Sequence, residues 1–214
     1  LVGADAIHPG VGFLSENASF ASICNSSGLN FIGPDHGAIE LVGNKARAKQ
    51  IAKKVKSYVI PGSAGIVESV QEGLDVAEEI GFPIYIKASA GGGGKGIRIA
   101  TSIKDFEKKF ITAQTEADLN FGNCDVYLEK MIENPRHIEV QIIADKHGNY
   151  VHLGERDCTI QRRRQKLIEE SPSPVISSTI RKKMGQMAIA IAKEAKYFSC
   201  GTVEFLLDKN NDFY

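Results

Sequence analysis

The residues best suited to chemistry form a glycine loop between two strand-like segments. Gly91 to Gly96 read GGGGKG, with Lys95 inside the loop and Lys87 on the apolar segment that enters it. Residues without a Cβ let successive backbone N–H groups approach phosphate oxygens, and lysine adds positive charge. A flexible surface turn is the alternative, but fixing a glycine run costs about 0.5–1 kcal/mol per residue. The loop therefore predicts contact with nucleotide phosphates.

Two common glycine motifs do not fit this loop. Gly91, Gly93 and Gly96 match G-x-G-x-x-G, but a strand pattern follows where a dinucleotide site needs a helix. A Walker A loop is excluded because Gly96 follows Lys95 where Ser or Thr is required, and Ser89 replaces the first glycine. The remaining interpretation is a β-hairpin with a glycine tip, which can close over a triphosphate as a lid.

A second group of charged residues lies toward the C-terminus. The run Arg162 to Lys166 places four positive charges in five strand-like residues, which repel one another unless an anion or carboxylates answer them. Glu204 alternates with apolar residues in Val203 to Leu207, so we expect it to be buried and to require a cation or a proton. Four carboxylates close in sequence are candidate partners for the run: Glu155, Asp157, Glu169 and Glu170.

The composition excludes several classes of function. Lys and Arg (26) balance Asp and Glu (26), so no overall charge attracts nucleic acid or an anionic membrane. No apolar run approaches the ~20 residues needed to span a bilayer. The four cysteines form no CxxC pair, which disfavours a disulfide framework or zinc site and predicts buried free thiols in a reducing compartment.

The elements that must position these residues follow from periodicity and turn signals. Residues 1–32 resemble the tail of an α/β domain. The class is α/β (α+β), with two segments around a nucleotide cleft. Helices are expected at 35–56, 69–80, 104–118 and 178–195, strands at 84–88, 97–100, 125–132, 136–144 and 150–160, and a hairpin from 203 with a polar turn at 209–212.

Longer blocks carry a family resemblance. KASAGGGGKGIRIA, HPGVGFLSEN, EKMIENPRHIEVQIIAD, GERDCTIQRRRQKLIEESPSP and GTVEFL occur in the order and spacing of biotin carboxylase, and the chain resembles that family over essentially its whole length. The resemblance implies an ATP-grasp fold in four parts. Residues 1–32 would end a Rossmann-like preATP-grasp domain, 33–59 form a helical linker, 60–131 the lid subdomain, and 132–214 the first part of the central domain.

The resemblance also implies roles for individual residues. Lys166 would hold bicarbonate beside the γ-phosphate, and Glu204 would bind magnesium together with the nucleotide. The other residues implied to contact ATP are Lys45, Lys87, Gly93, Gly94, Glu129, Lys130, Met131, Ile132, His137 and Arg164. Among them, the backbone of residues 129–132 would read the adenine edge. Two positions depart from the family pattern, since Val11 replaces a tyrosine and Arg164 a histidine found in some members.

The implied activity is the ATP-dependent activation of bicarbonate to carboxyphosphate, followed by carboxylation of biotin. ATP, Mg²⁺ (Mn²⁺ as an alternative) and biotin would be the cofactors and acceptor. A biotin carboxyl carrier protein and a carboxyltransferase would be partners in a homo-oligomeric, cytoplasmic enzyme, with mitochondrial matrix or plastid as alternatives. The chain stops before the family's next catalytic block, so by itself it is expected not to carboxylate biotin. Two alternatives to this function stay open. One is another ATP-grasp ligase resembling carbamoyl-phosphate synthetase, and the other is a nucleotide-binding module without turnover.

Overall fold

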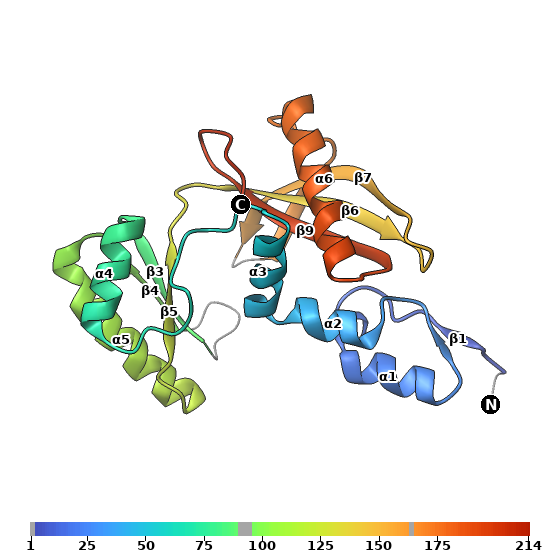
Figure 1. The fold of residues 1–214 in the computed structure, drawn as a ribbon, viewed down its shortest axis with the longest axis horizontal. Helices are drawn as coiled ribbons and strands as arrows, with labels where there is room; N and C mark the ends of the chain where they lie inside the picture. Colours follow the sequence, from blue (N-terminus) through green and yellow to red (C-terminus); the bar gives the residue numbers. More distant parts are fainter. Residues whose placement is uncertain (1–2, 90–95, 163–164) are drawn as a thin grey trace. The chain divides into compact units, whose positions relative to one another are not determined.

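The computed structural model describes residues 3–89, 96–162 and 165–214, apart from the side chains of Lys45 and Ala46. The chain divides into two compact units (Figure 1). One is Ile60–Glu133, and the other joins Leu1–Val59 to Asn134–Tyr214. The four-part division drawn from the family resemblance stays a prediction.

The unit Ile60–Glu133 packs two helices on a three-stranded antiparallel sheet (Figure 1). The sheet has the order β4-β3-β5, and β3 and β4 pair as a hairpin with Lys87 opposite Ile97. This pairing confirms the predicted hairpin and the absence of a helix directly after the loop. The elements are α4 (Val70–Ile80), β3 (Ile84–Ala88), β4 (Ile97–Ala100), α5 (Ile103–Phe121) and β5 (Val126–Lys130).

Alternation along β3 separates the core of this unit from its open face. Ile84 and Ile86 are fully buried with Phe106 of α5, whereas Tyr85 and Lys87 point to the other face. Gly73 of α4 permits the close approach of the helices, because a Cβ there would lie 2.7 Å from Cζ of Phe106. Burying these side chains offsets the entropy of ordering the sheet, which then holds Lys87 in place.

The start of α5 is fixed by Asp105. Its Oδ1 accepts hydrogen bonds from the Ser102 N–H (2.8 Å) and hydroxyl (2.9 Å), and its Oδ2 accepts from the Thr101 N–H (3.2 Å). Such contacts satisfy N–H groups that the helix cannot pair internally. Partial burial raises the pKa of Asp105, but these hydrogen bonds outweigh it and lower the pKa to about 2.

The first part of the other unit contains small elements in α/β order. β1 (Ala6–Ile7) and β2 (Asn30–Phe31) pair in parallel around α1 (Ala18–Ser26), and a short 3₁₀ helix, η1 (Phe13–Glu16), precedes α1. The single helix predicted at 35–56 is wrong, because the chain forms α2 (His36–Gly43) and α3 (Lys45–Lys54). Asn44 separates them with an extended backbone, and its side chain accepts a hydrogen bond from the Arg47 N–H to begin α3.

The rest of this unit is a four-stranded antiparallel sheet with α6 on one face (Figure 1). The strand order is β8-β7-β6-β9, so β6 lies between β7 and β9. Ile138 and Val140 of β6 are buried with Met184 of α6, and the intervening residues face the opposite side. The elements are β6 (Arg136–Ala144), β7 (Tyr150–Arg162), β8 (Gln165–Glu170), α6 (Ser178–Glu194) and β9 (Ser199–Leu207).

Two buried carboxylates of β7, on the face covered by α6, connect this strand to α6, to β6 and to the loop at Ser173. Arg181 of α6 holds Glu155 through bonds of 2.8 to 2.9 Å, and Arg136 reaches Asp157 at 3.1 Å. Ser173 bonds both acids, through its N–H to Glu155 (3.1 Å) and its hydroxyl to Asp157 (3.0 Å). Burial raises the pKa of Glu155, but the bonds from Arg181 and Ser173 outweigh it and lower the pKa below its ordinary value.

The C-terminal hairpin follows the prediction. Asp208 N–H donates to the Asp212 carbonyl at 2.9 Å, and Leu207 forms an antiparallel bridge with Phe213. Cys24 and Cys158 are buried as expected, but Cys124 and Cys200 are exposed. Among helices in the described part of the chain, none has the length and apolar character to cross a membrane.

The cap of α5 predicts a pH-dependent contribution to stability. Asp105→Ala should reduce the free energy of unfolding by about 1 kcal/mol at neutral pH. Because the pKa of Asp105 falls from 3.8 to about 2 on folding, this contribution is complete above the higher value and is lost as pH falls toward the lower. Urea unfolding at neutral pH and at about pH 3 measures the difference, with Glu107→Ala on the same helix as control. An equal difference at both pH values would contradict this account.

The contact between α6 and β7 predicts a second effect on stability. Arg181→Met removes the cation that holds buried Glu155, and the expected loss is about 1.5–3 kcal/mol, as for hydrogen bonds to charged groups. The exposed neighbour Lys182→Met is the matched control and should change the unfolding free energy little. Equal urea midpoints for the two variants would show that Arg181 does not anchor the helix.

Candidate functional site

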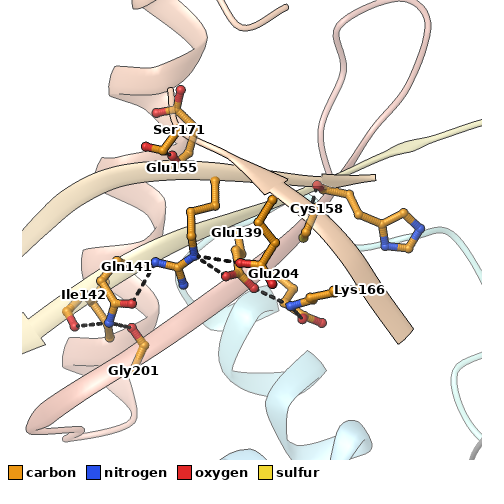
Figure 2. A network of polar contacts seen from close by, with 12 residues as sticks. Glu139, Gln141, Ile142, Glu155, Cys158, Lys166, Ser171, Gly201 and Glu204 are labelled. Atoms are coloured by element: carbon orange, nitrogen blue, oxygen red, sulfur yellow. Dashed lines mark hydrogen bonds and ion pairs between the residues drawn. The ribbon is translucent and has the colours of Figure 1, made fainter. Parts of the chain in front are cut away.

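The face of the four-stranded sheet opposite α6 carries a cluster of charged side chains (Figure 2). Strand pairing places Glu139 of β6 between Arg156 of β7 and Glu204 of β9. Lys166 of β8 completes the cluster, although β8 is separated from β6 by β7. Four strands therefore contribute charged side chains to one face.

Lys166 is shared between two carboxylates in very different surroundings. Its ammonium donates to Glu139 and, at 2.8 Å, to Oε1 of Glu204. The Glu139 side chain is 5% exposed, whereas that of Glu204 is 68% exposed. A buried ion pair is screened little and an exposed one strongly. Glu139 is therefore the anchor of Lys166, and Glu204 is the exchangeable contact.

The charges in this cluster are fixed by their neighbours. Burial lowers the pKa of Lys166, but its hydrogen bonds with Glu139 and Glu204 outweigh this and raise the pKa above the ordinary value. Burial raises the pKa of Glu139, while bonds from Lys166 and Arg156 lower it below the usual range. Lys166 is thus a permanent cation. Among the described residues, Glu139 and Glu204 accept two of its three N–H donors, which leaves one for a ligand.

The structure corrects two expectations about these charges. Glu204 is not buried, because β9 is an edge strand and the side chain lies on its open face. Glu155 and Asp157 pair with Arg181 and Arg136 on the other face of the sheet, and with no charged residue of the basic run that the structure describes. Glu139, the buried one of the two carboxylates that pair with Lys166, was not predicted from the sequence. Its alternation with Ile138 and Val140 was the available signal.

His137 lies on the same face of β6 as Glu139, one alternation earlier. Its backbone is held by β7, because its N–H donates to the Thr159 hydroxyl at 3.1 Å and its carbonyl accepts from the Cys158 thiol at 3.4 Å. The side chain is partly exposed. The strand therefore places His137 beside the cluster, and its predicted contact with a nucleotide stays a prediction.

In the unit Ile60–Glu133, two predicted ATP ligands pair with each other. Lys87 of β3 forms an ion pair with Glu129 of β5 on the face of the sheet away from the helices. Glu129 is buried, and the Lys87 side chain is 23% exposed. Lys87 Nζ also lies 5.1 Å from the ring centroid of Tyr85. The pairing holds the lysine at the mouth of the glycine hairpin.

Residues 129–132, which are predicted to contact adenine, are held in place by backbone hydrogen bonds. The Lys130 N–H donates to the Pro61 carbonyl (2.7 Å) and the Met131 N–H to the Pro83 carbonyl (3.0 Å). Lys130 Nζ is also engaged, at 2.9 Å from the Gly81 carbonyl at the end of α4. Ile132 N–H bonds to no described residue. Of these backbone donors, the one at Ile132 is available to a ligand.

Several predicted ligands cannot be placed in the same way. Gly93, Gly94 and Arg164 lie outside the described residues. Lys45 is the first residue of α3, but its side chain lies outside the description. In the residues described, no group of three or more His, Cys, Asp or Glu is arranged as a metal site.

Comparison with known families agrees with this geometry. The profile of the carbamoyl-phosphate synthase L chain, ATP binding domain, matches residues 44–214. The profile of the biotin carboxylase, N-terminal domain, matches residues 1–39. A biotin carboxylase of Nostoc sp. is 56% identical over 211 residues, which are 99% of this chain and 47% of that protein. Biotin carboxylase 1 of Bacillus subtilis is 51% identical over 214 residues, 100% of this chain and 48% of the relative.

Solved structures show the same fold. A biotin carboxylase complex from Campylobacter jejuni superposes with a TM-score of 0.86 at 49% identity, over 99% of this chain and 47% of that one. The biotin carboxylase domain of a thermophilic 2-oxoglutarate carboxylase reaches a TM-score of 0.93 at 46% identity, over 100% and 46% of the two chains. The chain spans about half the length of these relatives.

The likeness confirms the predicted α/β ATP-grasp fold and the family inferred from the motifs. The chain belongs to the family of the carbamoyl-phosphate synthase L chain ATP-binding domain and, within it, to the biotin carboxylases.

Proposed function

We propose that this chain is part of a biotin carboxylase that activates bicarbonate with ATP and carboxylates biotin. The observation that carries the proposal is the ammonium of Lys166, anchored by buried Glu139 beside exposed Glu204. A permanent cation with an unused N–H suits a small anion such as bicarbonate. Related structures support this reading, because one contains MgADP and bicarbonate.

In the proposed reaction a bicarbonate oxygen attacks the γ-phosphorus of ATP, which gives carboxyphosphate and ADP. Carboxyphosphate then releases CO₂ and phosphate, and N1 of biotin captures the CO₂ after losing its proton. Lys166 would orient bicarbonate and offset its negative charge as it approaches the phosphate. Lys87 and Lys45 would hold the phosphates, and closure of the glycine hairpin would exclude water.

The donor set at Glu204 fits magnesium. This ion takes oxygen ligands, keeps several waters, and commonly uses one or two carboxylates together with substrate phosphates. Glu204 offers an exposed carboxylate whose contact with Lys166 is exchangeable. When bound, the ion would neutralise charge on the phosphates, and Mn²⁺ accepts the same oxygen ligands. The chain's own contribution is the fixed position of Glu204 opposite Glu139.

Partners and location follow from the relatives and are part of the proposal. Relatives include a propionyl-CoA carboxylase alpha chain and a 2-oxoglutarate carboxylase small subunit. A biotin carboxyl carrier protein and a carboxyltransferase would therefore act with this chain, in a homo-oligomer. A cytoplasmic location is proposed, although a plant relative is named chloroplastic and a pig relative mitochondrial.

Lys166→Gln in the complete enzyme should depress bicarbonate-dependent ATP cleavage by about 10²–10³-fold, as for loss of a preorganised donor in an active site. The melting temperature should fall only slightly, because Glu139 keeps Arg156 as a partner. Steady-state assays with varied bicarbonate, with and without free biotin, measure the effect. Lys183→Gln, on the exposed side of α6, is the control. A collapsed melting temperature with normal bicarbonate dependence would make Lys166 structural.

Lys87→Ala in the complete enzyme should weaken ATP binding by roughly ten- to a hundred-fold, since a charge-assisted contact contributes about 1.5–3 kcal/mol. Arg98→Ala is a matched control, because Arg98 also forms an ion pair on this sheet, with Glu116. The control should lose stability and keep its affinity. Calorimetric titration with ATP decides, and unchanged affinity in Lys87→Ala would count against a phosphate contact.

A further inference from the structure

Arg156 lies beside the proposed bicarbonate site without belonging to the set of predicted ligands. It stands on β7 directly opposite Glu139. Its Nε donates to Glu139 Oε1 at 2.5 Å, and Nη1 donates to Gln141 Oε1 at 3.0 Å. Its Nε also lies 3.6 Å from Oε2 of Glu169. One planar guanidinium thus contacts three side chains from two neighbouring strands, β6 and β8, on the site face.

Gln141 holds this guanidinium to the backbone. While its Oε1 accepts from Arg156, its Nε2 donates to the Gly201 carbonyl (2.8 Å) and the Ile142 carbonyl (3.2 Å). Both amide protons and the amide oxygen are used, so the side chain has one orientation that satisfies all three bonds. Gly201 is in β9, the strand that also carries Glu204. Gln141 therefore fixes Arg156 relative to two strands of the site.

Glu139 divides its two oxygens between the cations. Oε1 accepts from Arg156 and Oε2 from Lys166. Without Arg156 at Oε1, the buried carboxylate would be free to rotate, and the Lys166 ammonium would be free to bond to both of its oxygens. The position of the Lys166 ammonium, and of its unused N–H, therefore depends on the Arg156 guanidinium as well as on Glu139.

We propose that Arg156 is a positioning residue for the carboxylation reaction and that Gln141 is its brace. Together they hold Glu139 so that Lys166 keeps one donor directed at bicarbonate. The proposal rests on the proposed function. It requires arginine in particular, because lysine supplies a charge but cannot bond Glu139 and Gln141 in one plane.

The test compares Arg156→Lys and Gln141→Met in the complete enzyme. We expect Arg156→Lys to raise the KM for bicarbonate by about 10²-fold, the effect of a misplacement of about 1 Å, and to leave the KM for ATP within about twofold. Gln141→Met, which leaves the charges intact, should raise the KM for bicarbonate by about tenfold, with the same split between substrates. A merely structural role would not separate the two KM values.

Arg136→Lys is the matched control. Arg136 pairs with a buried carboxylate of the same strand β7, Asp157, but on the other face of the sheet. It should lose stability and keep the parent KM for bicarbonate. A double variant with Lys166→Gln gives a second readout, because Arg156→Lys should have no further effect once its target is removed.

The outcomes separate the two proposals. If the parent enzyme shows no bicarbonate-dependent ATP cleavage, the proposed function fails. If the parent is active and both variants keep its KM for bicarbonate, the positioning role is wrong. An additive effect of Arg156→Lys in the Lys166→Gln background also overturns it. Should Arg156→Lys fail to fold, Gln141→Met decides alone, because it buries no new charge.

Discussion

Glu139 is an ionised carboxylate with 5% of its side chain exposed, on an inner strand of the four-stranded sheet. Transfer of such a group from water costs several kcal/mol unless cations and hydrogen bonds compensate for it. Here a guanidinium and an ammonium share its two oxygens. The sheet must therefore hold β7 beside β6, and β8 beyond β7, in fixed positions. The same requirement leaves Lys166 charged and partly exposed, in the state that an anion can use.

The buried carboxylates on the two faces of this sheet are paired with cations in different ways. Under α6, Glu155 and Asp157 are enclosed by Arg181, Arg136 and Ser173, which join β7 to α6, to β6 and to the loop before α6. On the open face, Glu139 shares Lys166 with an exposed carboxylate, Glu204. On the face under α6, ion pairs with buried carboxylates contribute to stability. On the open face, the exchangeable contact between Lys166 and Glu204 lies where substrates are proposed to bind.

Local signals in the sequence were sufficient to predict the position of most helices and strands. Turn residues and alternation located the glycine hairpin of β3 and β4, and the end of the long helical pattern at 178–195 lies within one residue of α6. The break at Asn44 was missed because the apolar spacing continues through it, while its side-chain cap decides the structure.

The charged site was harder to predict because it depends on distant strands. Glu139 meets Arg156 after 17 residues and Lys166 after 27, and alternation alone does not reveal which polar residue such partners will cover. The burial predicted for Glu204 was wrong for a related reason. A strand pattern separates two faces, but only the order of strands shows that β9 is an edge.

The pairing of β6 with β9 has a consequence for folding. Glu139 lies opposite Glu204, between the pairs Ile138 with Phe205 and Val140 with Val203. A shift of one residue in β6 would turn Glu139 toward Met184 in the apolar layer under α6 and expose Ile138 and Val140 to water. An unpaired carboxylate there would be more costly than the loss of apolar contacts alone. Glu139, which anchors the proposed catalytic lysine, thus also destabilises a misaligned register of β6. Selection for chemistry at this position is at the same time selection for correct pairing of the strands.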